Sequence, residues 1–160
     1  MLSIYHRAIT AQALSTDFSL SALDAVVAAH LGQDHWSHGQ IGHPEYHFED
    51  NAIIKSWTYM ESTRAQISPA LEAGDVLSAQ GALGRLTHAG QDLYAHSNYV
   101  SLWLSRFFEG KRPPLDEKDT FDSSLLQAPK LLSGKIYWPL EPFTRIPSLK
   151  RFGIPFLPYD

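Results

Sequence analysis

The sequence contains no cysteine among its 160 residues. This absence excludes disulfide frameworks and zinc sites built from thiolates. No run of eighteen apolar residues occurs, so no transmembrane helix is expected. The start of the chain also lacks the basic segment and apolar core of a signal peptide. We therefore expect a cytoplasmic location, or a secreted protein if Met1 replaces a signal peptide that has been removed.

The chain has no excess of positive charge, since 13 Lys and Arg residues face 17 Asp and Glu residues and the net charge is -4. Nucleic-acid binding is therefore not expected. The length and the 44% of hydrophobic residues predict one domain, residues 1–160, with a core of its own. Nothing in the composition determines the oligomeric state.

Histidine is the residue type that stands out. The chain has eight histidines, six of them within the first 47 residues, and the other two are His88 and His96. No histidine follows His96. Any site built from histidines must therefore be assembled from the first hundred residues.

Apolar periodicity predicts helices over residues 2–14, 19–32, 51–73 and 75–107. Asp75 is expected to cap the last of these. Pro69 is expected to kink or split the third helix, and Gly81, Gly84 and Gly90 are the candidate break points of the fourth. The predicted fold class is all-α: a single compact helical domain whose metal-binding core spans residues 1–110.

Residues 111–160 differ in character from the helical part. Residues 136–160 contain five prolines and six aromatic residues, and a short helix is predicted near residues 121–127. We expect an irregular, extended C-terminal arm that packs on the helices. The alternatives are contact with a partner, a peripheral contact with a membrane, or contact with an apolar substrate.

His88, Asp92 and His96 follow one another at intervals of four residues in the predicted fourth helix. In a helix this spacing places all three side chains on one face. Imidazole nitrogen and carboxylate oxygen are zinc ligands, and a carboxylate between two imidazoles suits a bridge between two ions. The alternative is an ordinary histidine–aspartate contact along a helix.

The loop at residues 33–50 carries four histidines, four acidic residues and three aromatic residues. Such a loop is either functional or a solvated surface. The aromatic residues favour a packed, functional loop, with Trp36 and Tyr46 lining a pocket. His35, His38 and His43 receive no ligand role.

Three segments together resemble the Het-C-like proteins, which are grouped with zinc-dependent bacterial phospholipases C and fungal single-strand-specific zinc nucleases. Residues 86–98, LTHAGQDLYAHSN, are similar to the family signature Leu-His-x-x-Gln-Asp-Phe-Tyr-x-His-Ser-Asn. Residues 42–50, GHPEYHFED, resemble the His-Phe segment of that family, and residues 6–10, HRAIT, resemble its early His-x-x-Ile-Thr. The resemblance covers residues 5–100 in order.

The resemblance implies a set of zinc ligands. Asp34, His47, His88 and Asp92 would hold the first ion, and His6 would join the bridging Asp92 on a second. His96 would belong to a further ion, but the later histidine that completes this site in the family is missing here. One zinc ion, and a second beside it, are therefore expected.

The same resemblance implies a zinc-dependent phosphoric-ester hydrolase. A metal-bound hydroxide would attack the phosphorus of a phospholipid or related small phosphodiester, with Asp34 and Asp92 as the catalytic residues. Two alternatives are a metal-stabilised interaction module without hydrolytic activity, and a metalloenzyme of the same fold with non-phosphate chemistry.

Overall fold

The computed structural model describes residues 1–35, 42–106 and 121–134. Within these ranges the regular elements are helices, and the β-type pairing is an isolated bridge between Ser97 and Ser133. This confirms the all-α prediction. None of the described helices is long and apolar enough to cross a membrane. Most of the predicted C-terminal arm, and the loop residues Trp36 and His38, lie outside the described residues.

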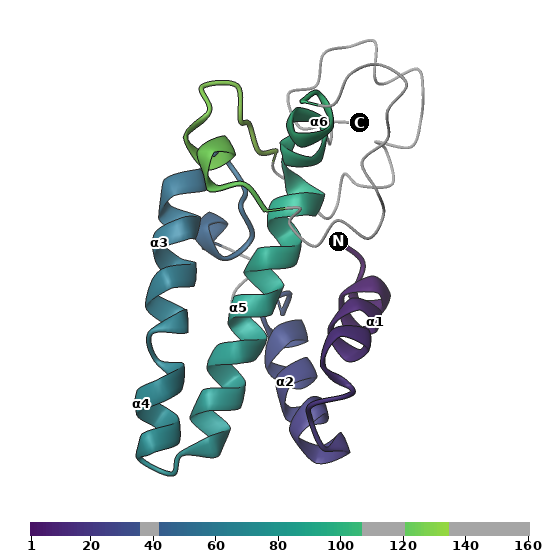
Figure 1. Cartoon of the computed structure of the whole chain (residues 1–160), viewed down its shortest axis with the longest axis vertical. Coiled ribbons are helices and arrows are strands. Elements are labelled where there is room, and N and C mark those ends of the chain that lie inside the picture. The colour runs from purple at the N-terminus through teal and green to yellow at the C-terminus, as the bar shows by residue number, and fades with distance from the viewer. Residues whose placement is uncertain (36–41, 107–120, 135–160) are drawn as a thin grey trace.

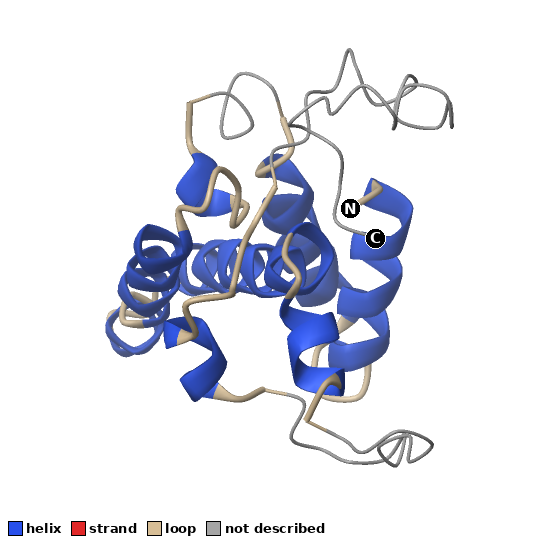
Figure 2. Ribbon diagram, turned by 90° about the horizontal axis from the view of Figure 1, so that it is seen from above, coloured by secondary structure: helices blue, strands red, loops and turns tan. Residues whose placement is uncertain are grey.

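The helices α1 to α6 are Ser3–Leu14, Leu20–Gly32, Ile53–Arg64, Ile67–Glu72, Val76–His96 and Tyr99–Leu104, and two 3-10 turns, η2 and η3, are Pro44–Tyr46 and Ser123–Gln127. Helix α5 is the central element (Figure 1). Helix α2 packs along one side of it, while α3 and α4 pack along the other. Helix α1 packs mainly on α2 and borders α5 (Figure 2). Helices α1 to α4 therefore all contact α5, the helix that carries His88, Asp92 and His96.

A cluster of buried apolar side chains lies between α3, α5, α6 and η3. Its buried members are Phe48, Ile53, Ala89, Leu93, Tyr99, Leu125, Leu126 and Leu131. Ile54 and Leu71, which helical periodicity placed on an inner face, are instead 67% and 54% exposed, and the apolar Ile4 and Ile9 of α1 are 69% and 45% exposed. Apolar periodicity over-predicts burial because short helices on the outside of a small domain cannot cover all of their apolar positions.

Two predicted helices are divided, but not at the expected residues. The third ends at Arg64, and α4 begins at Ile67 with Pro69 inside its first turn, where a proline costs no hydrogen bond. The fourth is divided at Ser97 and Asn98 into α5 and α6, and α5 runs unbroken through its three glycines. Gly84 permits close packing instead, because a Cβ there would lie 2.4 Å from the carbonyl oxygen of Val26. Gly90 has no such backbone neighbour.

Helix α5 begins and ends where side chains bind the backbone. Asp75 caps it as predicted, accepting a 3.0 Å hydrogen bond from the amide of Ser78. At the other end the Ser97 hydroxyl donates to the carbonyl of Leu93, and Ser97 adopts an extended conformation. Asn98 then binds the segment 130–132 through its side chain and its amide. The Ser-Asn pair of the motif therefore ends the helix.

Candidate metal centre

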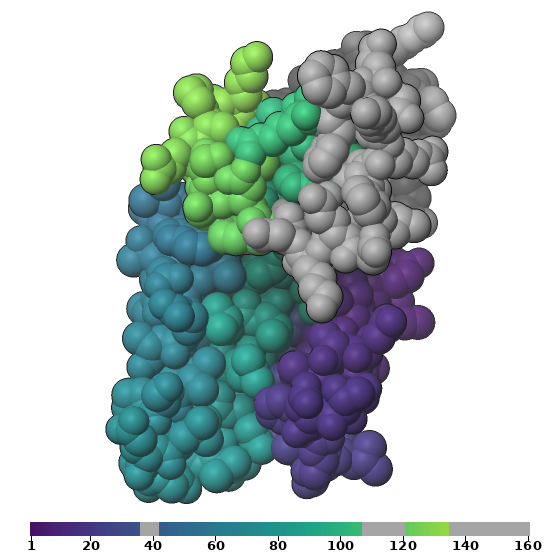
Figure 3. Space-filling model, viewed as in Figure 1, coloured from purple at the N-terminus to yellow at the C-terminus, as the bar shows by residue number. Residues whose placement is uncertain are grey.

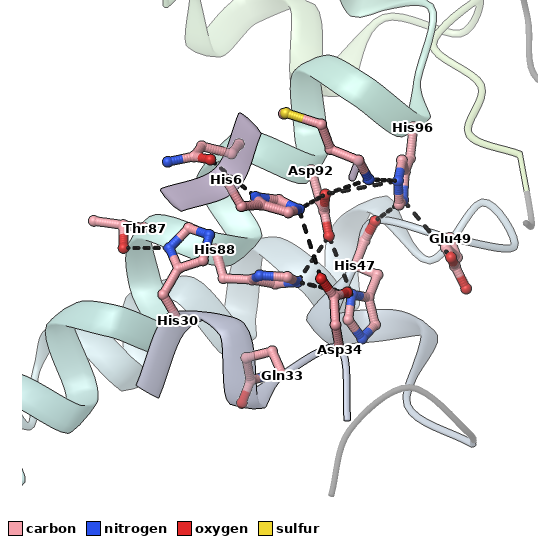
Figure 4. A network of polar contacts seen from close by, with 12 residues as sticks. His6, His30, Gln33, Asp34, His47, Glu49, Thr87, His88, Asp92 and His96 are labelled. Carbon is pink, nitrogen blue, oxygen red and sulfur yellow. Dashed lines mark hydrogen bonds and ion pairs between the residues drawn. The ribbon is translucent and has the colours of Figure 1, made fainter. Parts of the chain in front are cut away.

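Three side chains of α5 form one wall of a buried polar cluster (Figure 4). His88 and Asp92 are completely buried, and the side chain of His96 is 6% exposed. Asp92 Oδ2 lies 2.9 Å from His88 Nε2, and Asp92 Oδ1 lies 3.6 Å from His96 Nε2. The helical spacing therefore places one oxygen of the central carboxylate toward each histidine, as expected.

Two other segments bring Asp34 and His47 to the same carboxylate. Asp34 lies just after the end of α2, and His47 follows η2. His47 Nδ1 lies 3.1 Å from Asp92 Oδ2 and 3.0 Å from His88 Nε2. Asp34 Oδ1 lies 3.6 Å from His88 Nε2 and 3.9 Å from His47 Nδ1. Four potential ligand atoms from three segments thus converge on one point.

These separations suit a tetrahedral metal site. Four ligands at about 2.0–2.1 Å from a zinc ion lie about 3.3 Å from one another. The five separations just given run from 2.9 to 3.9 Å. The set, of two imidazole nitrogens and two carboxylate oxygens, matches the ligand preference of zinc rather than that of calcium or magnesium.

The loop that carries His47 is held in an unusual backbone conformation. Phe48, Asp50 and Asn51 have positive φ angles of 51°, 53° and 56°, a region that residues other than glycine seldom occupy. Phe48 is fully buried, and Asn51 exchanges two hydrogen bonds with Ser133. This packing offsets the backbone strain and keeps His47 directed at Asp92.

A second group of atoms surrounds the other oxygen of Asp92. His6 Nε2 lies 3.3 Å from Asp92 Oδ1 and 3.9 Å from Asp34 Oδ2. The Met1 amine lies 3.5 Å from Asp92 Oδ1 and 2.7 Å from His96 Nε2. Each aspartate therefore presents one oxygen to each group. His6 and Asp92 Oδ1 are buried and make no hydrogen bond to one another among the described residues.

His96 is oriented by the backbone. Its Nδ1 lies 3.1 Å from the carbonyl oxygen of His47, and because a carbonyl only accepts, this nitrogen carries the proton. The lone pair is then on Nε2, the atom that faces Asp92 and the Met1 amine. Glu49 Oε1 lies 3.7 Å from the same Nδ1. His96 thus presents a basic nitrogen to the second group.

The cluster favours a charged Asp92. Burial raises the pKa of this carboxyl, but the imidazoles of His47, His6 and His88 outweigh burial and hold its pKa well below the usual value. Burial lowers the pKa of His47, yet its hydrogen bond to Asp92 and the neighbouring acids raise that pKa overall. Burial lowers the pKa of His96 to about 4. A charged Asp92 and a neutral His96 are the charge states that metal binding requires, whereas a metal ion would have to compete with a proton for His47.

His30 is a member of the cluster to which the sequence analysis assigned no role. It is fully buried, and its ring lies 4.8 Å from the ring of His6 and 4.9 Å from that of His88. Its Nδ1 contacts the hydroxyls of Thr10 and Thr87. Its position one turn after the buried Val26 and Val27 marks it as an inward residue of α2. That spacing is the signal that could have found it.

His30 makes the metal-free domain sensitive to acid. Burial, with His88 and His6 nearby, lowers its pKa from 6.5 to about 3. Between those pH values the unfolded chain binds a proton that the folded chain does not, so stability is complete above about pH 6.5 and falls as the pH decreases. Between pH 7 and pH 5 we expect the free energy of unfolding of metal-free wild-type protein to fall by about 2 kcal/mol more than that of metal-free His30→Gln. Urea unfolding at the two pH values measures this difference. Parallel pH curves for the two proteins would contradict this assignment.

His43, to which no ligand role was assigned, lies outside the cluster. His43 pairs with Glu45 at 3.0 Å, and its side chain is 45% exposed. Its ring stacks on Tyr46, which in turn lies 4.4 Å from the ring of Tyr59. Tyr46 therefore belongs to an aromatic stack beside η2. The pocket predicted for Trp36 and Tyr46 stays a prediction, because Trp36 is outside the described residues.

Comparison with known proteins gives the chain a relationship that its motifs did not suggest. The family model described as VWA7 N-terminal domain matches residues 2–110. The chain is also 32% identical over 82 residues to von Willebrand factor A domain-containing protein 7 of Rattus norvegicus. That match covers 51% of this chain and 9% of the rat protein, so the chain spans a small part of this relative. No solved structure gives a significant match.

These comparisons correct three sequence-based predictions. The assignment to the Het-C-like and phospholipase C-like proteins is wrong, because the family model and the rat relative both belong to a different family. The prediction of a zinc-dependent phosphoric-ester hydrolase rested on that assignment and is wrong as well. The description of the protein as phospholipase C-like is wrong for the same reason. Short motifs of histidine and aspartate at helical spacing record a local geometry that unrelated families can share.

Proposed function

Because the chain belongs to the VWA7 N-terminal domain family, we propose its function from the chemistry of its own buried cluster: the domain binds zinc, and the metal ties its helices together. One observation carries the proposal. Nitrogen and oxygen atoms from α2, α5 and the loop after η2 converge at 2.9 to 3.9 Å around one point. His47, His88, Asp34 and Asp92 would hold this first ion.

Electrostatics support the presence of a cation. Asp92 is completely buried, and a buried carboxylate is costly unless positive charge compensates it. Its neighbours include His96, whose pKa is lowered to about 4 and which is therefore neutral at pH 7. A divalent ion would add positive charge beside Asp92, where the Met1 amine lies 3.5 Å from Oδ1, and would bind neutral imidazoles through their lone pairs.

A second zinc ion fits on the opposite side of the same carboxylates. Ligand atoms of His6, Asp34 and Asp92 lie, with one of His88, within 4.8 Å of one another, and His96 Nε2 lies 3.6 Å from Asp92 Oδ1. Asp92 and Asp34 would then bridge the two ions, each with one oxygen per ion. Asp34 is the more exposed of the two carboxylates, at 23% against 0%, so an approaching molecule would meet the cluster on the Asp34 side.

Enzymatic activity, the catalytic roles of Asp34 and Asp92, a small-molecule substrate, a peripheral membrane contact and a cytoplasmic location all stay predictions. None of them is needed for the zinc proposal. The ion is assigned here to holding the domain together, a role that zinc fulfils in many small domains.

The experiment that tests the proposal is a zinc titration of metal-free protein against a competing chromogenic chelator. Wild-type protein is expected to take up at least one equivalent tightly. His47→Asn should bind the first equivalent more than about 100-fold more weakly, because a ligand is lost. The matched control is His43→Asn, which removes an exposed histidine of the same loop and should leave the affinity unchanged. Equal affinities in the two variants would contradict the proposal.

A further inference from the structure

Gln91 of α5 contacts α1 beside the buried polar cluster. Its Oε1 is 2.9 Å from His6 Nδ1, and its Nε2 donates a 2.9 Å hydrogen bond to the Thr10 hydroxyl. His6 and Thr10 are the buried residues of α1 and lie one turn apart. A single side chain of α5 therefore binds both inward positions of α1.

The contact with Gln91 determines where His6 carries its proton. An amide oxygen only accepts, so His6 Nδ1 is the donor and Nε2 carries the lone pair. That lone pair faces Asp92 Oδ1 at 3.3 Å, and neither atom has a hydrogen bond within the described residues. Two buried acceptors at this distance repel, so a metal ion or a proton between them would stabilise the pair.

We propose that Gln91 is a positioning residue that fixes the Nδ1-protonated tautomer of His6 and thereby makes Nε2 a ligand of the second zinc ion. The inference rests on the zinc binding proposed above and deepens it. Outer partners of this kind orient the ring of a metal-binding histidine, and their loss typically weakens metal binding by about 10- to 100-fold. Gln91 is adjacent in sequence to Asp92, so one turn of α5 supplies both the carboxylate and the residue that orients its neighbour.

The alternative is a purely structural role, in which Gln91 only holds α1 against α5 through Thr10. Three variants of the full chain separate the two roles. Gln91→Met removes both contacts, and Gln91→Glu keeps an acceptor for His6 Nδ1. Thr10→Val removes the contact of Thr10 with Gln91, together with that of Thr10 with His30 Nδ1, and leaves the Gln91–His6 contact in place. The first measurement is the ¹⁵N chemical shifts of the His6 ring in metal-free protein at a pH where the ring is neutral. The second is the affinity for the second equivalent of zinc.

Wild type, Gln91→Glu and Thr10→Val are expected to show the Nδ1-protonated tautomer and second-equivalent affinities within about 3-fold of one another. Gln91→Met should move the proton to Nε2, which then donates to Asp92 Oδ1, and should weaken the second equivalent by about 10- to 100-fold. An unchanged tautomer in Gln91→Met, or an equal loss of affinity in Thr10→Val, would overturn the inference. If wild-type protein bound no zinc at all, the proposed function itself would fail, and the ligand role of His6 with it.

Discussion

Asp92→Asn is expected to abolish zinc binding. The Asp92 carboxylate is completely buried, and both of its oxygens face imidazole nitrogens at 2.9 to 3.6 Å. The substitution keeps the shape of the side chain but removes its charge and replaces one oxygen with a hydrogen-bond donor. Because Asp92 would contribute an oxygen to each ion, we expect both equivalents to weaken by more than about 100-fold in the chelator titration.

The matched control for this substitution is Asp24→Asn, which removes an exposed carboxylate from α2. It should bind zinc as wild-type protein does. Elemental analysis of the purified variants gives an independent value of the metal content. If Asp92→Asn retained a full equivalent of tightly bound zinc, the assignment of Asp92 as the central ligand would be wrong.

Removing the metal with EDTA is expected to release α1 and to lower the melting temperature by about 10 °C. Helix α1, which lies at the molecular surface (Figure 3), buries only His6 and Thr10, while its apolar residues Ile4 and Tyr5 are 69% and 57% exposed. Its attachment therefore depends on polar contacts with the cluster more than on hydrophobic burial. Zinc at about 1,000 times its dissociation constant would contribute about 4 kcal/mol, and for a domain of this size each kcal/mol raises the melting temperature by roughly 2–4 °C.

Hydrogen exchange measured by mass spectrometry locates this effect. Amides of α1 should exchange faster after chelation, while those in the first half of α5, residues 76–84, should change little. The slow-exchanging part of α5 serves as the internal control, because it is packed between α2 and α4 and away from the ligands. Unchanged protection of α1 in metal-free protein would show that the metal does not hold this helix.

Much of the candidate site could be predicted because helical geometry is local. Spacing of four residues places His88, Asp92 and His96 on one face whatever the rest of the chain does. The distances from Asp92 to Asp34, His47 and His6 depend on how three separate segments pack, which local patterns do not determine. His30 was missed for a related reason. A histidine among apolar residues of a helix gives no sign of its neighbours until α2 is placed against α5.

The boundaries of the helices show where local rules fail. Glycines are weak helix formers, so they were the natural break points of the long fourth helix. The break falls at Ser97 and Asn98, because their side chains bind the backbone and the segment 130–132. Gly84 is retained inside α5, where it allows α2 to approach closely. Tertiary packing thus keeps glycines inside α5 at positions where helix propensity alone predicted a break.

The functional prediction failed at a different step. A set of histidines and aspartates defines which ion a site can hold, but the reaction depends on the surroundings of that ion and on the protein to which the domain belongs. The ligand pattern was extended to phosphoester hydrolysis through a resemblance that the family match does not support. The proposed metal site rests on the distances between the side chains and needs no such resemblance.

X-ray absorption at the zinc edge of the zinc-loaded 160-residue chain tests the central claim most directly. We expect a first shell of nitrogen and oxygen at about 2.0–2.1 Å, with the outer-shell scattering of at least two imidazoles. The imidazole signal should decrease when His88 is replaced by Asn in protein loaded to the same zinc content. A spectrum without imidazole scattering, or one that His88→Asn leaves unchanged, would contradict zinc binding by this buried cluster.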